Sequence, residues 1–186
     1  MTGPIGRFKY LTSQLMTCIV IFVSRLQQEL KQRKPFQSTA QEALLGLMRT
    51  TDLVRRQAAA AIEPHGITLQ QFNVLRILRG GGTDGVPTLE IADRMVERTP
   101  GITRLLDRLE AKGFVKRQRC QKDRRQHLCW ITPKSAALLE KLDAPMLEFG
   151  EQLMKGLNQE QRMTLIRLLD ALRSAHEEPT NEEPHS

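Results

Sequence analysis

Residues 99–114, TPGITRLLDRLEAKGF, have the pattern of a short amphipathic helix with clear start and end signals. Thr99 is a good helix N-cap, Pro100 suits the first helical position, where its missing N–H costs nothing, and Gly113 predicts the helix end. Apolar residues at 102, 105, 106 and 109 form one stripe, so we expect that side to be buried. The opposite side then carries the polar residues Thr103, Arg104, Asp107 and Arg108.

Two strand-like segments follow, FVKRQRC and QHLCWI, and their composition predicts a β-hairpin. The turn between them gathers four cations around one acid: Arg119, Lys122, Arg124 and Arg125 around Asp123. Like charges at a hairpin tip repel one another in an isolated monomer, but they suit the negative potential of a DNA minor groove. A solvated turn that only maintains solubility is the alternative, and the adjacent amphipathic helix argues against it.

Helical patterns flank the amphipathic stretch and the predicted hairpin on both sides. Residues 38–62 repeat apolar side chains at helical spacing, residues 68–79 end at three glycines, and LEIADRMV predicts a short helix. A long helix is predicted from residue 133 to about 156, and a last one after residue 158. Capping signals mark the expected starts: Thr68 with Gln71, Thr88, Thr132 with Pro133, and Asn158 with Gln161.

The expected order is helix, helix, short helix, helix, two-stranded wing, helix, helix, a fold that is mainly α with a small β wing. Two short helices joined by a tight turn and followed by a β-hairpin define a winged helix-turn-helix, here at residues 67–132. The second short helix of such a unit is built to enter a DNA major groove. Thr103 suits a base edge or a thymine methyl, while Arg104 and Arg108 suit guanine or phosphate.

The charge balance agrees with a polyanionic partner. The formal net charge is +7 and the isoelectric point is near 9.7, although residues 177–186 hold four acids and no Lys or Arg. A body this basic suits nucleic acid or an anionic membrane surface, and charge alone does not decide between them. The acidic, Pro-containing tail at 177–186 is expected to be disordered.

The first 37 residues form an extension with an apolar run at 15–23, LMTCIVIFV. The run has the character of a signal-peptide core, but it is too short for a transmembrane helix and no A-x-A-like cleavage site follows. The alternatives are a segment packed on the fold or on a partner subunit, or sequence ahead of a later start at Met16. Three cysteines without disulfide-framework spacing favour a reducing compartment, so we expect a cytoplasmic protein with no membrane partner.

Across residues 38–172 the chain resembles the multiple-antibiotic-resistance regulator (MarR) family. GITLQQFNVLRIL resembles the family's second helix, TLEIADRMVERTPGITRLLDRLEAKGFVKR its helix-turn-helix and first wing strand, and DRR at 123–125 with WIT at 130–132 its wing signature. The resemblance implies an obligate homodimer, with residues 38–66 and 133–176 as the helical dimerisation domain, and two winged domains that read a palindromic double-stranded DNA operator. The first 37 residues and the glycine-rich loop 80–85 depart from the family pattern.

The resemblance also assigns roles to residues. It implies major-groove contacts from Thr99, Pro100, Thr103 and Arg104. It further implies that Arg125 enters the minor groove and that Asp123 holds the wing. The predicted DNA-binding set is completed by Gly101, Arg108 and Arg124. Members of the family usually repress transcription, and many release DNA when a small aromatic acid or phenol binds between the dimer and DNA domains, so we expect such a repressor, with no cofactor.

Rival functions have weaker support. A cysteine-based redox-sensing repressor would use Cys18, but this residue lies ahead of the matching helix, and the only tyrosine is Tyr10. The sequence contains no catalytic or nucleotide-binding motif, which argues against an enzyme. A winged-helix module that binds protein or RNA is the remaining alternative, with a basic face that only maintains solubility.

The two cysteines of the hairpin raise a separate possibility. If the turn centres on residues 124 and 125, Cys120 and Cys129 face each other across the wing, and His127 shares the side of Cys129. A disulfide or a zinc site is then geometrically possible, although a structural zinc ion would need one more ligand and buried cysteines usually act as small apolar residues. We therefore expect no metal.

Overall fold

The computed structural model describes residues 24–97, 100–121, 123 and 125–176. The chain divides into two compact units, residues 1–52 and 53–186, and the boundary falls inside helix α2. The first unit contains α1 (Arg25–Glu29) and the first part of α2 (Thr39–Ile62). Ser24 begins α1, because its hydroxyl oxygen accepts a hydrogen bond from the N–H of Gln27 at 3.2 Å.

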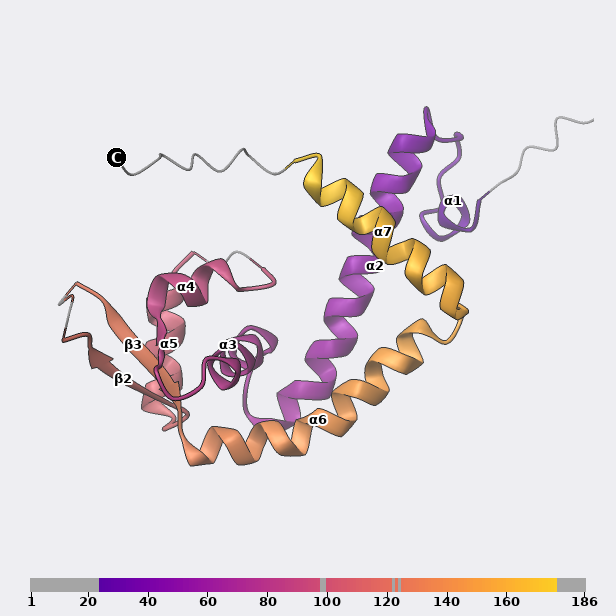
Figure 1. Ribbon diagram of the computed structural model, residues 1–186. Helices are drawn as coiled ribbons and strands as arrows, with labels where there is room; N and C mark the ends of the chain where they lie inside the picture. Colours follow the sequence, from indigo (N-terminus) through magenta and orange to yellow (C-terminus); the bar gives the residue numbers. More distant parts are fainter. Residues whose placement is uncertain (1–23, 98–99, 122, 124, 177–186) are drawn as a thin grey trace, which may run out of the picture. The chain divides into compact units, whose positions relative to one another are not determined.

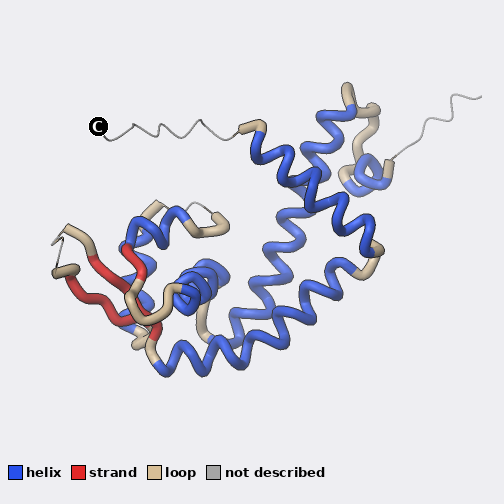
Figure 2. The backbone as a smooth tube through the Cα atoms, in the orientation of Figure 1, coloured by secondary structure: helices blue, strands red, loops and turns tan. Residues whose placement is uncertain are grey.

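The second unit combines several helices with a small sheet (Figures 1 and 2). After α2 its elements are the 3-10 helix Glu63–His65, α3 (Leu69–Gly80), β1 (Val86–Pro87), α4 (Thr88–Asp93), α5 (Ile102–Ala111), β2 (Val115–Arg119), β3 (His127–Ile131), α6 (Pro133–Met154) and α7 (Gln159–Ser174). The predicted class, mainly α with a small β wing, is confirmed. Within the ranges described above, no helix has both the length and the hydropathy needed to cross a membrane.

Reciprocal capping boxes begin three of these helices. Thr68 and Gln71 cap α3, and Asn158 and Gln161 cap α7, as the sequence predicts. At α6 the predicted N-cap, Thr132, exchanges hydrogen bonds with Ser135. Local signals of this kind mark these helix starts, and at α6 the hydroxyls of Thr132 and Ser135 also donate to the carbonyl oxygens of Gly113 and Phe114.

Thr88 is not the N-cap that its position suggested. It is the first residue of α4, after Pro87, and its hydroxyl donates to the carbonyl oxygen of His127 at 3.3 Å. The helix ends at Asp93, earlier than the pattern LEIADRMV predicts. The threonine hydroxyl therefore links α4 to the wing instead of stabilising the start of the helix.

The sheet has three antiparallel strands in the order β1-β3-β2, where the sequence predicted two. Between β2 and β3 the register pairs Lys116 with Trp130 and Arg117 with Cys129. On the other edge of β3, the two-residue strand β1 pairs Val86 with Cys129. A strand of two residues is too short to show the alternation of apolar and polar side chains by which strands are recognised. The sequence therefore did not predict β1.

The core of the second unit lies between α3, α5, α6 and the sheet. Three residues of the predicted α5 stripe are buried, since Leu106 and Leu109 are fully covered and Leu105 is nearly so, and the fourth, Ile102, is half-buried against the same core. They share one cluster with Phe72, Leu75, Leu78, Ile91, Val115, Cys129, Leu139 and Leu142. The four polar residues opposite the stripe, at 103, 104, 107 and 108, are exposed. The core therefore anchors α5 with its polar side outward.

The glycine-rich loop after α3 closes against β3. Trp130 donates its indole N–H to the carbonyl oxygen of Thr83 at 2.9 Å. Gly85 has a φ of 76°, and a Cβ atom there would lie 2.4 Å from Cε2 of Trp130. Glycine is needed at 85 both for its backbone conformation and for the close approach of the indole ring.

An ion pair joins α3 to α6. Arg79 donates from two guanidinium nitrogens to the two carboxylate oxygens of Asp143, at 2.8 and 2.9 Å. These hydrogen bonds lower the pKa of Asp143 and raise the pKa of Arg79. Because the folded-state pKa of Asp143 is lowered, the stability it contributes is present above the pKa of an unfolded aspartate and is lost as the pH falls through the folded-state value.

Asp143→Asn is expected to lower the melting temperature at neutral pH by a few degrees at most, because the pair is half-exposed and screened by solvent. The difference from the wild type should begin to shrink below the pKa of an unfolded aspartate, about 3.9, and should vanish only below the lowered folded-state pKa of Asp143, where the wild-type carboxylate is also neutral. Thermal unfolding followed by circular dichroism at a series of pH values measures this. Glu148→Gln, on the same helix, is the matched control, and a difference that stays constant at every pH would contradict the assignment.

Candidate nucleic-acid interface

The second short helix, α5, begins later than the sequence predicts. It starts at Ile102 with Gly101 as its N-cap, so Pro100 does not occupy the first helical position. Thr99, the predicted N-cap, lies outside the described residues. Gly101 has a φ of 96°, a left-handed conformation that residues with a Cβ atom rarely adopt, and this glycine lets the chain turn into the helix.

The end of α5 is the predicted one. Gly113 has a φ of 71° and follows the C-cap Lys112. The N–H groups of Gly113 and Phe114 donate to the carbonyl oxygens of Glu110 and Leu109, at 2.8 and 2.9 Å. This pair of hydrogen bonds is the Schellman motif, and it directs the chain into β2 without a longer loop.

The predicted DNA-contacting residues of α5 lie on two different sides of the helix. Thr103 lines a groove between α5 and the wing, whereas Arg108 lines a second hollow with Arg55 and Arg56 of α2. Arg104 is exposed. Side chains three and four positions apart share a side of a helix, so Asp107 accompanies Thr103 and Arg108 does not. The structure therefore brings Thr103, but not Arg108, together with the wing.

The groove beside the wing has a volume of about 760 Å³. Thr103 and Glu110 line it from α5, and Pro87, Thr88 and Leu89 from β1 and the start of α4. The wing contributes the basic and polar side chains of Arg117, Gln118, Arg119, Arg125, Gln126 and His127. A polar helix side and a basic hairpin thus border one open groove, which is the arrangement that a phosphate backbone requires.

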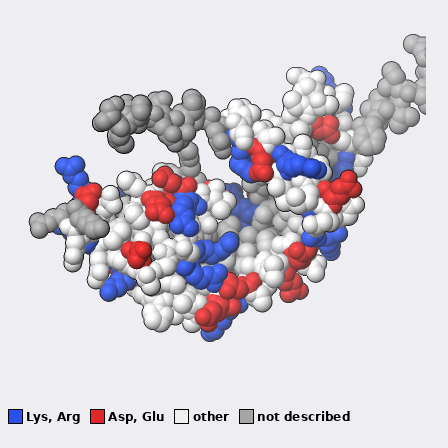
Figure 3. All heavy atoms as spheres, viewed as in Figure 1, with Lys and Arg blue, Asp and Glu red and all other residues white. Residues whose placement is uncertain are grey.

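At the tip of the wing, Asp123 holds the backbone in place. Its carboxylate accepts a hydrogen bond from the N–H of Arg125 at 2.9 Å, and its carbonyl oxygen accepts one from Gln126 at 3.0 Å. Arg125 is exposed, and Arg124 lies outside the described residues. Figure 3 shows Lys and Arg side chains interspersed with Asp and Glu side chains over the visible face. Asp123 therefore acts on the main chain of the turn and leaves the side chain of Arg125 projecting.

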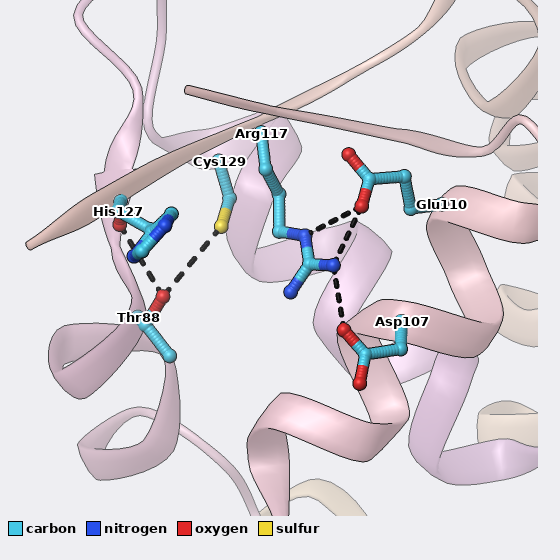
Figure 4. A network of polar contacts seen from close by, with 6 residues as sticks. All are labelled: Thr88, Asp107, Glu110, Arg117, His127 and Cys129. Carbon is cyan, nitrogen blue, oxygen red and sulfur yellow. Dashed lines mark hydrogen bonds and ion pairs between the residues drawn. The ribbon is translucent and has the colours of Figure 1, made fainter. Parts of the chain in front are cut away.

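A cluster that the sequence analysis did not anticipate joins the wing to α5 (Figure 4). Arg117 on β2 donates to Glu110 from Nε at 2.8 Å and from Nη2 at 2.6 Å, and to Asp107 from Nη2 at 2.6 Å. The hydrogen bond to Glu110 is the main cause of the raised pKa of Arg117. The only sequence signal for this cluster is a pair of acids one helical turn apart, Asp107 and Glu110, followed by a tight turn into a basic strand.

The structure also corrects the expected pairing of the cysteines. Cys129 lies opposite Arg117, and Cys120 lies at the open end of the ladder, where its N–H donates to Gln126. Both are free thiols, and they do not face each other. Burial raises the pKa of the Cys129 thiol, whose sulfur is 3.9 Å from the hydroxyl of Thr88. Among the described residues, no three His, Cys, Asp or Glu side chains are grouped closely enough to hold a metal ion.

Cys120 is expected to react with a maleimide at least about tenfold faster than Cys129, because the reactive species is an accessible thiolate. Cys129 is fully buried with a raised pKa, so it should react only when the sheet opens. Peptide mass spectrometry of a Cys18→Ser protein, sampled over time, measures the two rates. Equal rates would contradict the burial of Cys129.

These features define a class: a short helix pair followed by a wing, with a polar helix side and cations along one groove, is a winged helix-turn-helix DNA-binding domain. Residues 67–127 match the model of the MarR family. The chain is 30% identical over 116 residues to the uncharacterized HTH-type transcriptional regulator YwoH of Bacillus subtilis (strain 168), covering 62% of this chain and 82% of that one. The chain belongs to the MarR family of DNA-binding transcriptional regulators.

Solved structures agree with this assignment. A MarR transcription factor from Planctomyces limnophilus is similar with a TM-score of 0.57 and 36% identity, over 74% of this chain and 99% of that one. MepR of S. aureus, in a complex with DNA, is similar with a TM-score of 0.64 and 25% identity, over 72% of this chain and 96% of that one. Proteins of this family are DNA-binding regulators rather than enzymes.

Proposed function

We infer that the protein is a homodimeric repressor that binds a palindromic DNA operator and is released by a small aromatic or phenolic ligand. The observation that carries this proposal is the shared groove of α5 and the wing, which gathers Thr103, Arg119 and Arg125 on one open surface. In the proposed complex α5 enters the major groove and Arg125 reaches the adjacent minor groove. Arg104 extends the contact along α5.

Homodimer formation is supported by apolar side chains exposed on the helices outside the winged region. On α2 these are Leu44, Leu47, Met48 and Leu53, and on α7 they are Met163, Ile166, Leu168 and Leu172. Apolar residues on this scale mark an interaction surface. A second copy of the chain is the partner we propose, because two winged domains related by a two-fold axis match the two halves of a palindrome.

Ligand control is supported by a hollow of about 150 Å³ between α3, α6 and the segment that follows α4. Phe72, Met95 and Met146 give it an apolar lining, and Arg76 lies 5.8 Å from the centre of the Phe72 ring. An aromatic ring with an acidic group suits an apolar hollow beside a cation. Glu97, five residues before the start of α5 in the sequence, also lines this hollow.

Transcription in vitro from the promoter of the protein's own gene tests both parts of the proposal. Added protein should reduce transcript, and benzoate or phenol should restore it, with Arg76→Gln weakening the response to benzoate more than the response to phenol. Undiminished transcript at saturating protein would overturn the repressor role. Repression that neither ligand relieves would overturn ligand control by this class.

A further inference from the structure

We propose that Arg117 is a positioning residue for operator binding: by holding Asp107 and Glu110 it sets the wing against α5 and screens two carboxylates from the duplex. The inference rests on the proposed function, because it concerns how the same surface meets DNA. Arg117 itself does not contact the operator in this account. It acts through the two acids and through the strand that carries it.

The geometry shows a side chain committed to its own protein. Nε and Nη2 of Arg117 make three hydrogen bonds of 2.6 to 2.8 Å to Asp107 and Glu110. The Arg117 side chain is only 19% exposed, whereas Asp107 and Glu110 are 53% and 41% exposed. In Figure 4 the guanidinium lies between the wing and α5 and points toward the helix. The guanidinium of Arg117 is thus largely covered between the wing and α5, whereas the carboxylates of Asp107 and Glu110 are about half-exposed at the edge of this contact.

The two acids stand where DNA is expected. Glu110 lines the groove together with Thr103, and Asp107 lies between them on the same side of α5. A free carboxylate there would repel the phosphates and would also be an acceptor for a cytosine amino group. Arg117 offsets the negative charge and occupies one oxygen of each carboxylate, Oδ1 of Asp107 and Oε2 of Glu110, so the cluster presents neither feature at full strength.

The same contacts fix the angle of the wing. The chain passes from α5 into β2 through the turn at Gly113, and Arg117 is the third residue of the strand. Its bonds to positions 110 and 107 fasten the strand to the helix about one and two turns before Gly113. Thr88, which donates to the carbonyl oxygen of His127, fastens the other strand to α4. A wing held at two points brings its tip to DNA with less ordering cost on binding.

Four proteins form a cycle that separates positioning from direct contact: the wild type, Arg117→Gln, the double variant Asp107→Asn with Glu110→Gln, and the combination of all three changes. Arg117→Gln removes the same charge whether positions 107 and 110 carry the acids or the amides. Fluorescence anisotropy with the operator gives the four affinities. Unfolding followed through Trp130, the only tryptophan of the chain, verifies that each variant is folded.

Arg117→Gln should weaken operator binding by about tenfold or more when the acids are present, and by no more than about threefold when they are amides. Lys116→Gln is the matched control, because Lys116 is the exposed neighbour on β2 and makes no ion pair within the described part of the chain; it should bind within about threefold of the wild type. Equal losses in both backgrounds would show that Arg117 touches DNA directly and overturn the inference, as would wild-type affinity in Arg117→Gln. A wild type that fails to distinguish operator from random DNA would overturn the proposed function first.

Discussion

Leu168→Glu is expected to convert the protein to monomers and to weaken operator binding by about a hundredfold or more. Leu168 is 64% exposed on α7, so the single chain tolerates the change. In the proposed dimer the new carboxylate would be buried among apolar side chains without a partner, which is strongly unfavourable. Each monomer would then hold only one half-site, and the advantage of binding both halves together is lost.

Sedimentation equilibrium and operator titration measure the two effects together. The wild type should sediment at about twice the chain mass of 21.2 kDa, and the variant at the chain mass. Ala137→Glu is the matched control, because it adds the same charge at an exposed position near the start of α6, outside the exposed apolar side chains of α2 and α7. A dimeric Leu168→Glu protein with normal affinity would remove α7 from the interface.

Arg125→Ala is expected to weaken operator binding by about ten- to a hundredfold and to reduce the slope of log affinity against log salt by about one. The substitution keeps the backbone N–H that Asp123 accepts from, so the turn itself should be preserved. What is lost is the exposed guanidinium at the wing tip. A cation drawn to the minor groove contributes both affinity and counterion release.

Two comparisons isolate this effect. Lys155→Ala, at the end of α6, removes an exposed cation outside the wing and should leave both affinity and salt slope nearly unchanged. Thr103→Ala should relax base preference at one position of each half-site without altering the slope, because a base contact releases no counterion. An unchanged affinity in Arg125→Ala would show that the wing tip does not meet the duplex.

The elements set by local chemistry could be predicted from the sequence. The capping boxes at Thr68 and Asn158 need only residues three apart, and the stripe of α5 needs only its own period. The start of α5 was predicted wrongly because Thr99 and Pro100 form a familiar capping pattern. The left-handed backbone of Gly101, which displaces the helix start to Ile102, leaves no such mark in the sequence.

The contacts that depend on register and on tertiary packing could not be predicted. A turn centred on residues 124 and 125 would place Cys120 opposite Cys129, but the ladder pairs Arg119 with His127 and so centres the turn at Asp123. Because of this shift in register, the residue opposite Cys129 is Arg117 and not Cys120. It also places the guanidinium of Arg117 beside the acids of α5, which the linear order of residues does not reveal.

In the proposed complex α5 and the wing together read a DNA sequence. The most direct measurement is competition, at physiological salt, between a palindrome from the protein's own promoter and random DNA of equal length. The protein should prefer the palindrome by about a thousandfold or more, as is typical of specific DNA-binding proteins. Equal affinity for the two DNAs would contradict it.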